Sequence, residues 1–463
     1  MENNNPLDVL IAHNQHDIID YYNKLKTDKK DFFLKCLRRL DLQLVLKLHQ
    51  QFFKSSLNPQ ADNSMVIKTA PIIPTPKSDM EKEKAHRAKQ TGEALLRDGK
   101  VAVLIVAGGQ GSRLGFDGPK GFYAISPIRR KSLFQIFSEQ IRALSKRYLA
   151  TIPLIIMTSE ENHDSTVQFF ENNACFGLNK DEIYFFSQDL LPAVTPEGKL
   201  VLSNDHGLFT NPNGHGGSLK GLYDSGILRT LLDKKYTALF YCQVDNPLVK
   251  IADPVFLGYH TMANADVSTK VVRRRSVEEK VGVYLSCNGK DAIIEYSDMA
   301  PENMSALDEK GNILYWAGNT AIHVFSLPFI QRINDHGFSL PYHCAKKNID
   351  VTHTNGKSSR IDVWKFETFV FDAVPLAERA CCMEIVREEE FSPVKNKNGS
   401  DSPQTARSAM VNLHRGWLKK AGINAIPQAV IEISPLFALD ENEFIGKVSG
   451  KNLTVSSDTY FGE

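Results

Sequence analysis

The chain has 463 residues, of which 42% are hydrophobic and 24% are charged, and these proportions exclude a disordered or membrane-embedded protein. Its length suits one large catalytic domain with appendages, or two to three domains. The net charge of +1 at pH 7 argues against a nucleic acid as the main partner, because domains that bind nucleic acids usually carry a strong basic excess.

The cysteines indicate a reducing compartment. There are seven, an odd number, and none belongs to a C-x-x-C pair, so we expect neither a disulfide framework nor a zinc site. The N-terminus has no basic segment followed by an apolar one, which predicts no signal peptide and a cytoplasmic location. Cys381 and Cys382 lie in an apolar run and are predicted to be buried, inert thiols.

Residues 1–98 form an N-terminal region that we expect to be helical. Five leucines recur at helical spacing, which predicts a packed face: Leu34, Leu37, Leu40, Leu44 and Leu48. A proline-rich strap at 70–76 interrupts the helices, and a highly charged helix is expected at 79–97.

The next region opens with a run of seven apolar residues, 101–107. Such a run without alternation is typical of a parallel strand that is covered on both faces. Gly108, Gly109 and Gly111 follow directly. Because these residues lack side chains, we expect the loop to adopt unusual backbone angles and its amides to converge on an anion.

Two cations complete this loop, Arg113 and Lys120, and together with the glycines they predict a triphosphate-binding site. Two better-known glycine loops are excluded. A dinucleotide fingerprint would need a third glycine where this chain has Leu114. A Walker loop would need a hydroxyl residue after Lys120, where this chain has Gly121.

Strands and helices alternate after the loop, which predicts an α/β fold with a doubly wound, mostly parallel, Rossmann-like sheet. The strands are expected at 101–107, 152–158, 183–187 and 238–244, and the helices near 132–148, 161–172 and 216–233. Ligands in such sheets bind at the carboxyl ends of the strands. Gly108 and Asp245 each follow a strand, so we expect them to meet at one crevice.

Asp245 is a candidate ligand for a hard cation, because its carboxylate should project from the end of a buried strand. Mg²⁺ usually takes one or two carboxylates and completes its coordination with substrate phosphates, so one aspartate is sufficient. The alternative is an Asx turn formed by Asp245, Asn246 and Pro247.

The polar stretch 394–405 predicts an exposed loop between the core and a tail. The tail should contain one amphipathic helix near 405–421 and short β-like runs at 430–433 and 453–455. The expected domains are therefore a helical region at 1–98, a catalytic core at 99–403 and a small C-terminal domain at 404–463. We expect the basic triplet 273–275 to be a solvated turn or strand end.

The pattern G-G-x-G-[ST]-R-L-G-x(3)-P-K at 108–120 resembles the signature of the UDP-sugar pyrophosphorylase family, and most closely its UDP-N-acetylhexosamine branch. Further blocks occur in the order that the family has them. They lie at 185–192, 213–217, 244–254, 281–283, 295–297, 317–319, 369–372 and 390–396. Chance agreement over eight ordered blocks is very improbable.

This resemblance implies uridylyl transfer, in which a sugar 1-phosphate attacks the α-phosphorus of UTP and pyrophosphate leaves. It places Arg113, Lys120 and Lys395 on the phosphates. It makes Asp245 the ligand of a Mg²⁺ cofactor, and it puts Lys365 near the phosphates with less support from a motif. Such transfer depends on positioning and charge stabilisation rather than on a protein nucleophile.

The resemblance also assigns base and sugar recognition. Gln188 matches the position that reads uracil, with backbone contacts from Gly108 and Gly109. The remaining matches are expected to hydrogen-bond the sugar: Gly214, His215, Gly216, Glu295 and Asn319. An alternative for Asn319 is a turn residue.

His215 is a departure from the branch, whose members usually have asparagine there, while Gly-His-Gly resembles UDP-glucose and broad UDP-sugar pyrophosphorylases. The expected product is UDP-N-acetylglucosamine, made from UTP and N-acetylglucosamine 1-phosphate. The alternatives are a glucose-1-phosphate or broad UDP-sugar enzyme, and a non-catalytic nucleotide-binding module. We expect a monomer or weak homodimer with no nucleic-acid or membrane partner.

Overall fold

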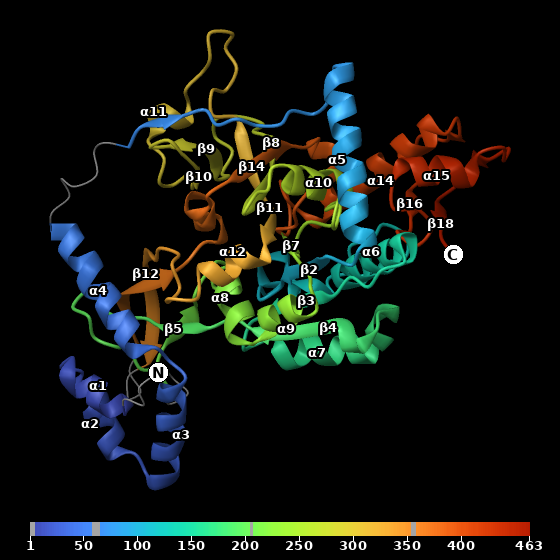
Figure 1. Cartoon of the computed structure of the whole chain (residues 1–463). Helices are drawn as coiled ribbons and strands as arrows, with labels where there is room; N and C mark the ends of the chain where they lie inside the picture. Colours follow the sequence, from blue (N-terminus) through green and yellow to red (C-terminus); the bar gives the residue numbers. More distant parts are fainter. Residues whose placement is uncertain (1–4, 58–64, 204–206, 353–357) are drawn as a thin grey trace. The chain divides into compact units, whose positions relative to one another are not determined.

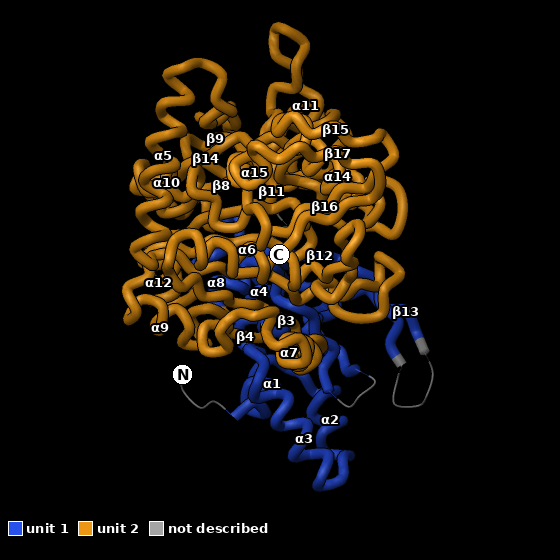
Figure 2. The backbone as a smooth tube through the Cα atoms, turned by 90° about the vertical axis from the view of Figure 1, so that its right-hand side faces the viewer, with its two compact units in different colours: residues 1–65, 188–220, 339–372 blue, residues 66–187, 221–338, 373–463 orange. Residues whose placement is uncertain are grey.

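The computed structural model describes residues 5–57, 65–203, 207–352 and 358–463, and the chain separates into two compact units (Figure 2). Unit 1 comprises residues 1–65, 188–220 and 339–372, and unit 2 comprises residues 66–187, 221–338 and 373–463. Both units are therefore built from segments that are far apart in the sequence. The domain boundaries expected from the sequence follow the chain order and remain a prediction.

Unit 1 combines the N-terminal helices with short strands from later in the chain. Its elements are α1 (Pro6–Ala12), α2 (His16–Lys24), α3 (Thr27–Arg38), α4 (Leu42–Leu57), β5 (Leu190–Pro192), β6 (Thr210–Pro212), β12 (His343–Thr352) and β13 (Ser358–Glu367). Buried Gln15 joins these segments, because its side chain donates to the carbonyl of Gly198 at 2.8 Å and accepts from the amide of Leu200 at 2.9 Å.

The leucines of the N-terminal helices form the apolar core of unit 1, as their spacing predicts. Leu37 and Leu48 are buried, and Leu34, Leu40 and Leu44 pack against the same cluster. Trp364 and Phe366 of β13 belong to this cluster as well. The helices therefore bury their apolar faces against the strands that follow much later in the chain.

The described part of unit 2 contains a ten-stranded mixed sheet (Figure 1). Its strands are β1 (Ile67–Lys68), β2 (Val101–Val106), β3 (Leu154–Thr158), β4 (Ile183–Ser187), β7 (Ala238–Gln243), β8 (Val267–Arg273), β9 (Val283–Cys287), β10 (Lys290–Ile294), β11 (Ala317–Ser326) and β14 (Ala380–Glu384). The order is β1-β9-β11-β7-β2-β3-β4, while β8 joins β11 to β14 and β10 pairs with β9.

Four neighbouring strands of this sheet, β7-β2-β3-β4, are parallel, which confirms the predicted Rossmann-like core. Val106 lies opposite Gln243 and Met157 in the registers of β2 with β7 and β3. The carboxyl ends of these strands consequently share one edge, and the loops after β2 and β7 begin side by side. Strand β11 runs antiparallel to β7, so the sheet is mixed rather than uniformly parallel.

Four helices of unit 2 begin and end close to the predicted limits: α5 (Asp79–Arg97), α6 (Leu133–Tyr148), α7 (His163–Asn172) and α14 (Pro403–Lys420). Helix α9 (Ile227–Asp233) covers part of another expected helix, and α8 (Gly217–Asp224) crosses the unit boundary. The remaining helices were not predicted: α10 (Pro254–Met262), α11 (Pro301–Met304), α12 (Leu327–Arg332), α13 (Arg387–Glu390) and α15 (Glu441–Val448). Within the described ranges, none of the helices is long and apolar enough to cross a membrane.

Two expectations differ from the structure. The single helix expected at 216–233 is two helices, α8 and α9, because the chain turns at Gly226 with a φ of 75°. The basic triplet is only partly solvated, since Arg274 is buried and donates to the carbonyls of Met304, Tyr315 and Val277. An arginine can be buried when carbonyl oxygens satisfy its donors, and a charge run does not reveal this.

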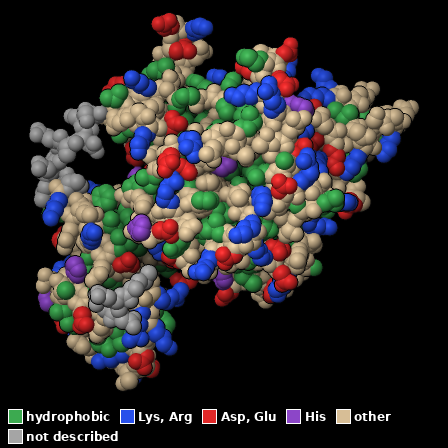
Figure 3. All heavy atoms as spheres, viewed as in Figure 1, with side chains coloured by type: hydrophobic (Ala, Val, Ile, Leu, Met, Phe, Trp, Pro, Cys, Tyr) green, Lys and Arg blue, Asp and Glu red, His purple; other side chains and the backbone are tan. Residues whose placement is uncertain are grey.

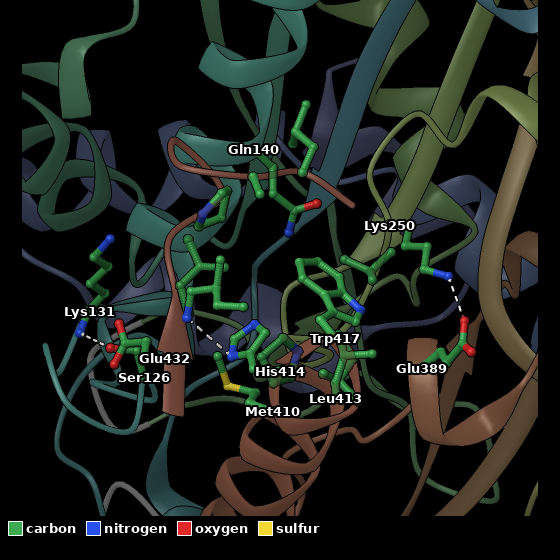
Figure 4. A pocket seen from close by; sticks show the side chains of 18 residues that line it. Ser126, Lys131, Gln140, Lys250, Glu389, Met410, Leu413, His414, Trp417 and Glu432 are labelled. Carbon is green, nitrogen blue, oxygen red and sulfur yellow. Dashed lines mark hydrogen bonds and ion pairs between the residues drawn. The ribbon is translucent and has the colours of Figure 1, made fainter. Parts of the chain in front are cut away.

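The C-terminal segment has an apolar core of its own, built on α14 and α15. Its short strands are β15 (Asn424–Ala425), β16 (Ile431–Ile433), β17 (Thr454–Val455) and β18 (Thr459–Phe461). The segment packs on the rest of unit 2 around a pocket lined by side chains of α6, α14, β16 and the loop after β7 (Figure 4). The predicted helix and β-like runs of the tail are therefore confirmed.

Basic and acidic side chains are interspersed on the face of the molecule shown in Figure 3. On this face, positive and negative side chains are therefore mixed and do not form one large basic patch and one large acidic patch. Functional charge must be sought in local clusters, where a few side chains converge on one point.

Candidate active site

The glycine loop follows β2 and folds back as a narrow turn. The amide of Gly111 donates to the carbonyl of Gly118 at 2.8 Å, and the amide of Lys120 donates to the carbonyl of Gly109 at 3.0 Å. Between these bonds lies a short 3₁₀ turn, η2 (Ser112–Leu114). Buried Asn162 holds the base of the loop, because its side-chain amide donates to the carbonyl of Ala107 at 3.1 Å.

The loop adopts unusual backbone angles, as expected, but at other glycines than the three singled out from the sequence. Positive φ values in the loop occur at Gly115 (69°) and Gly118 (136°), not at Gly108, Gly109 or Gly111. A methyl group on Gly111 would lie 2.7 Å from the Phe116 ring, whereas one on Gly109 would meet no atom within 4 Å. Gly109 therefore leaves the backbone open on its exposed side.

Several amides of the loop have no acceptor. Within the described residues, the main-chain bonds of the loop do not use the amides of Gly108, Gly109, Gln110, Ser112 and Arg113. Unpaired amides of consecutive residues form the kind of concavity that binds anions. The geometry therefore supports the predicted phosphate-binding role of this loop.

Lys120 and Asp245 meet at the shared edge of β2 and β7, the edge at which the sequence predicts that Gly108 and Asp245 lie together. The Lys120 Nζ atom lies 3.4 Å from Asp245 Oδ2, and the two side chains are only 13% and 10% exposed. The amide of Val244 donates to the carbonyl of Val106 at 3.0 Å, which fixes the ends of the two strands. A cation and a carboxylate are thus held together where the glycine loop begins and ends.

The turn after β7 is made by Asn246 and not by Asp245. The Asn246 Oδ1 atom accepts from the amides of Leu248 at 3.4 Å and Ser392 at 3.1 Å, while Nδ2 donates to the carbonyl of Glu390 at 2.7 Å. The Asx-type function that sequence reasoning considered for Asp245 therefore belongs to its neighbour. The Asp245 carboxylate remains directed to Lys120.

The third predicted phosphate ligand, Lys395, is brought to the same place. The amide of Val394 donates to the carbonyl of Asp245 at 2.8 Å, so Lys395 follows a residue that is tied to the end of β7. Arg113 and Lys395 are both exposed. No carboxylate of the described residues forms an ion pair with either of them, which leaves their charges available for an anion.

Glu295 and Asn319 lie together around Gly282. The amide of Asn319 donates to the carbonyl of Gly282 at 2.8 Å, and a methyl group on Gly282 would lie 3.1 Å from Glu295 Oε1. Asn319 also accepts from the amide of Ala321 at 3.0 Å, beside a register shift in β11. The side chain of Asn319 thus also stabilises a turn, which is the alternative role considered for it. Because β11 is antiparallel to β7, Asn319 lies toward the sheet edge that carries Asp245.

The other candidates belong to unit 1 and form a separate cluster. The Gln188 side chain is buried and donates from Nε2 to the carbonyl of Gly214 at 2.5 Å. Gly214 has a φ of 84°, and a methyl group there would lie 2.2 Å from the carbonyl oxygen of Thr368. Gly216 donates to that same oxygen at 2.9 Å. Glycine is therefore required where the chain passes residue 368.

His215 projects between these glycines onto aromatic rings. Its ring lies 5.4 Å from that of Phe369 and 5.7 Å from that of Phe371, and Nδ1 accepts from the amide of Val370 at 3.1 Å. Burial, with a smaller effect of nearby His343, lowers the pKa of His215 to about 4. The imidazole is consequently neutral at pH 7, and its proton resides on Nε2.

Lys365 lies on β13, three residues before Thr368, and its ammonium group is 5.0 Å from the centre of the Phe209 ring. Loss of hydration lowers the pKa of Lys365, and nearby Lys347 lowers it further. Its place on the strand that ends beside Gly214 groups it with Gln188 and His215 in unit 1.

Three residues that shape the unit 2 cluster were not predicted as site residues: Asn162, Lys397 and Asn246, which was named only as part of a possible turn. Lys397 lies against Gly115 of the glycine loop. Asn162 and Asn246 are buried polar residues at the ends of strands, and buried polar side chains of this kind are usually hydrogen-bonded. In the sequence, the only indication of a role for Asn162 and Asn246 was their position shortly after an apolar run, and many asparagines in loops have such a position.

Asp245 is the carboxylate that the described residues place beside the glycine loop and Lys120. Within the described ranges, no three His, Cys, Asp or Glu side chains converge on a point that could hold one. Asp245 nevertheless fits Mg²⁺, because this ion accepts one protein carboxylate when phosphate oxygens complete its coordination. The nearby Lys120 would then share those phosphates.

A glycine loop after a central parallel strand, with a lysine and an aspartate at the same sheet edge, defines a nucleotidyltransferase with a Rossmann-like core. Similarity to known protein families agrees with this class. The chain belongs to the UTP–glucose-1-phosphate uridylyltransferase family, whose model matches residues 46–462.

Relatives in this family cover most of the chain. It is 36% identical over 419 residues to the UDP-N-acetylglucosamine pyrophosphorylase of Saccharomyces cerevisiae, covering 86% of this chain and 87% of the relative. It is 33% identical over 450 residues to UDP-N-acetylglucosamine diphosphorylase 2 of Arabidopsis thaliana, covering 91% and 87%.

The fold also matches a solved structure. The uridine diphosphate N-acetylglucosamine pyrophosphorylase of Trypanosoma brucei aligns with a TM-score of 0.81 over 98% of this chain and 97% of that one. The two sequences are 23% identical, so this likeness shows the shared fold.

Proposed function

We propose that the protein is a uridylyltransferase that forms UDP-N-acetylglucosamine and pyrophosphate from UTP and N-acetylglucosamine 1-phosphate. The observation that carries this proposal is the Lys120–Asp245 pair, at 3.4 Å. It lies beside a loop in which, within the described residues, the amides of Gly108, Gly109 and Gln110 have no main-chain acceptor. The names of the relatives support the choice of uridine and of the acetamido sugar.

The reaction is an in-line displacement. A phosphate oxygen of the sugar 1-phosphate forms a bond to the α-phosphorus of UTP while the bond from this phosphorus to the pyrophosphate oxygen breaks. The nucleophile is already an anion at neutral pH, so no general base is needed. Loop amides together with Arg113, Lys120 and Lys395 would neutralise charge on the phosphates, which is how positioning and electrostatics accelerate such transfers.

Asp245 is the residue we assign to a Mg²⁺ cofactor. When bound, Mg²⁺ neutralises phosphate charge and orients the phosphate oxygens. Lys120 would turn from Asp245 to the phosphates once the metal compensates the carboxylate. Lys120 would then contact the substrate phosphates and Asp245 would contact the metal ion, in place of the ion pair between the two side chains.

Base and sugar recognition are assigned to neutral hydrogen-bonding groups. Gln188 retains an amide oxygen and one N–H beyond its bond to Gly214, enough to accept from and donate to a uracil edge. For the sugar, we assign His215, Glu295 and Asn319. Lys365 would contribute a positive charge.

A glucose-1-phosphate or broad UDP-sugar enzyme is the second candidate, and His215 is the observation that favours it. An imidazole in contact with Phe369 and Phe371 fills more space than the asparagine usual in the N-acetylhexosamine branch. Less room would then remain for an acetamido group.

The deciding experiment measures pyrophosphate release with UTP and Mg²⁺, comparing the 1-phosphates of N-acetylglucosamine, N-acetylgalactosamine, glucose and galactose. Preference for acetamido sugars supports the proposal, and preference for glucose makes His215 the mark of specificity. No release with any sugar would support a nucleotide-binding module. Lys120→Ala is the site control, and turnover within a few-fold of the parent would refute the role assigned to Lys120.

We further propose a cytoplasmic monomer or weak homodimer that acts on UTP and a sugar 1-phosphate and has no nucleic-acid or membrane partner. The seven cysteines are odd in number and include no C-x-x-C pair, which supports a reducing compartment. Burial raises the pKa of Cys381 to about 11, in keeping with an inert thiol. Sedimentation of the purified protein over a range of concentrations tests the assembly state.

A further inference from the structure

A short turn at 394–401 connects the end of β7, at Asp245, with the glycine loop, at Gly115. It is fastened at one end, where the amide of Val394 donates to the carbonyl of Asp245 at 2.8 Å. The amides of Lys395 and Asn396 then donate to the carbonyl of Asp401 at 2.7 and 3.0 Å. The Asn396 side chain also donates to the carbonyl of Ser400 at 3.0 Å. These bonds close the segment into a defined turn.

The tip of this turn reaches the glycine loop through Lys397. A methyl group built on Gly115 would lie 3.1 Å from Cδ, 3.2 Å from Cε and 3.4 Å from Nζ of Lys397. The side chain of Lys397 therefore lies directly over Gly115, which has a φ of 69° and is two residues from Arg113. Any larger residue at 115 would displace the lysine as well as strain the backbone.

The ammonium group of Lys397 has no counter-ion. Among the described residues no carboxylate forms an ion pair with Lys397, and the residue is exposed. The same is true of Arg113 and Lys395. Among the described residues, three cations without carboxylate partners therefore lie on or near a loop in which several amides, those of Gly108, Gly109 and Gln110 among them, have no main-chain acceptor. A polyanion is the ligand that would satisfy these groups.

We propose that Lys397 is a further phosphate-binding residue, whose ammonium group contacts the polyphosphate of UTP and, in the reverse reaction, pyrophosphate. This inference rests on the proposed function. It makes the 394–401 turn a two-lysine element, with Lys395 beside the end of β7 and Lys397 over the glycine loop. The interaction is one of ground-state binding, because it does not involve the atoms whose bonds change.

Kinetics of Lys397→Ala and Lys397→Arg, with Lys451→Ala as the control, test this role. Lys451 is an exposed lysine of the C-terminal segment. We expect Lys397→Ala to raise the KM for UTP and the inhibition constant of pyrophosphate about fivefold, as for a partly exposed charge pair, with kcat within about twofold. The salt dependence of the KM should weaken. Lys397→Arg should recover most of the affinity, because it keeps the charge.

Equal constants for Lys397→Ala and Lys451→Ala would overturn the proposal, and so would an equal loss in the alanine and arginine variants. Calorimetric titration of each variant with UTP and with inorganic pyrophosphate separates this result from the proposed function. A protein that transfers no uridylyl group but binds UTP more weakly after Lys397→Ala would refute the proposed reaction and retain the Lys397 assignment. Unchanged binding of both ligands would refute the assignment alone.

Discussion

In the proposed reaction, the nearly buried Lys120–Asp245 pair would serve binding rather than stability. Taking two charges out of water costs free energy that their attraction offsets only in part, so such a pair adds little to folding. Its value lies in keeping a cation and a carboxylate ready at one point. Each can exchange its protein partner for a substrate phosphate or a metal ion.

Asp245→Asn should weaken the response to Mg²⁺. The amide keeps the size of the side chain and removes its charge, so we expect the half-saturating Mg²⁺ concentration to rise at least about tenfold and kcat to fall by about 10²-fold. The measurement is pyrophosphate release against Mg²⁺ concentration, with the exposed Asp298→Asn as control. An unchanged Mg²⁺ response would place the metal at another residue.

His215→Asn should shift sugar preference. The shorter side chain can still accept the Val370 amide bond while leaving room beside Phe369 and Phe371, so we expect the ratio of kcat/KM for N-acetylglucosamine 1-phosphate over glucose 1-phosphate to rise about tenfold. The measurement compares both sugars with parent and variant. If the ratio stays constant while the variant remains folded, His215 is a packing residue.

At the scale of elements, the turn after β7 depends on one side chain. Asn246 links the end of β7 to residues 390–392 by hydrogen bonds to Glu390 and Ser392. The turn that carries Lys395 begins two residues after Ser392. A local polar residue therefore sets the position of a distant catalytic candidate.

Asn246→Ala should destabilise the protein and impair the site together. Loss of buried hydrogen bonds leaves the Ser392 amide and the Glu390 carbonyl without this partner, at a cost of about 2–4 kcal/mol in the free energy of unfolding. We also expect a higher KM for UTP, because Lys395 loses its anchor. Thermal unfolding and steady-state kinetics give the two readouts, and the exposed Asn173→Ala serves as control. A lower melting temperature with an unchanged KM would contradict the positioning role.

The elements themselves were largely predictable from the sequence. Strands β2, β3, β4 and β7 are continuous apolar runs next to amphipathic helices, and these local patterns survive in the structure because each buries its own apolar face. Strand β11 was not predicted, and its antiparallel pairing with β7 depends on contacts between segments about 80 residues apart. The same holds for Asn162 and Asn246, whose partners are remote backbone groups that leave no periodic signal.

The candidate site was predictable where a motif is contiguous and not where it is assembled. Gly109, Arg113 and Lys120 lie within one loop, so a contiguous stretch of sequence made them candidates, and the family resemblance supported their phosphate roles. Lys397 was missed because its relation to Gly115 arises from the closed turn at 394–401 and not from the loop's own sequence. The alternative of an Asx turn at residues 245–247 did not identify the side chain that makes the turn, because Asp245 and Asn246 both favour turns.

At the scale of the whole molecule, buried histidines link stability to pH. His260 and His414 are both buried, and burial lowers the pKa of each to about 4. His260 is hydrogen-bonded through Nδ1 to the hydroxyl of Ser268 at 2.8 Å, and His414 accepts from the amide of Ile433 at 3.3 Å (Figure 4). Both belong to unit 2, in α10 and α14.

These pKa values predict acid destabilisation between about pH 6.5 and pH 4. In this window the unfolded chain binds protons that the folded protein excludes, so the free energy of unfolding falls as the pH is lowered. The stabilisation is complete above pH 6.5, the ordinary pKa of histidine. Each histidine should contribute roughly 2–3 kcal/mol to the loss at pH 4, a large share of the 5–15 kcal/mol typical of a domain.

Urea unfolding at several pH values between 7 and 4.5 measures this effect in a Trp364→Phe background, where the remaining tryptophans, Trp316 and Trp417, report on unit 2. We expect His260→Asn combined with His414→Asn to flatten the dependence on pH, because asparagine can accept the same hydrogen bonds and does not titrate. The exposed His16→Asn should leave it unchanged. If the double variant keeps the parent slope, carboxylates rather than these histidines couple the folding of unit 2 to protons.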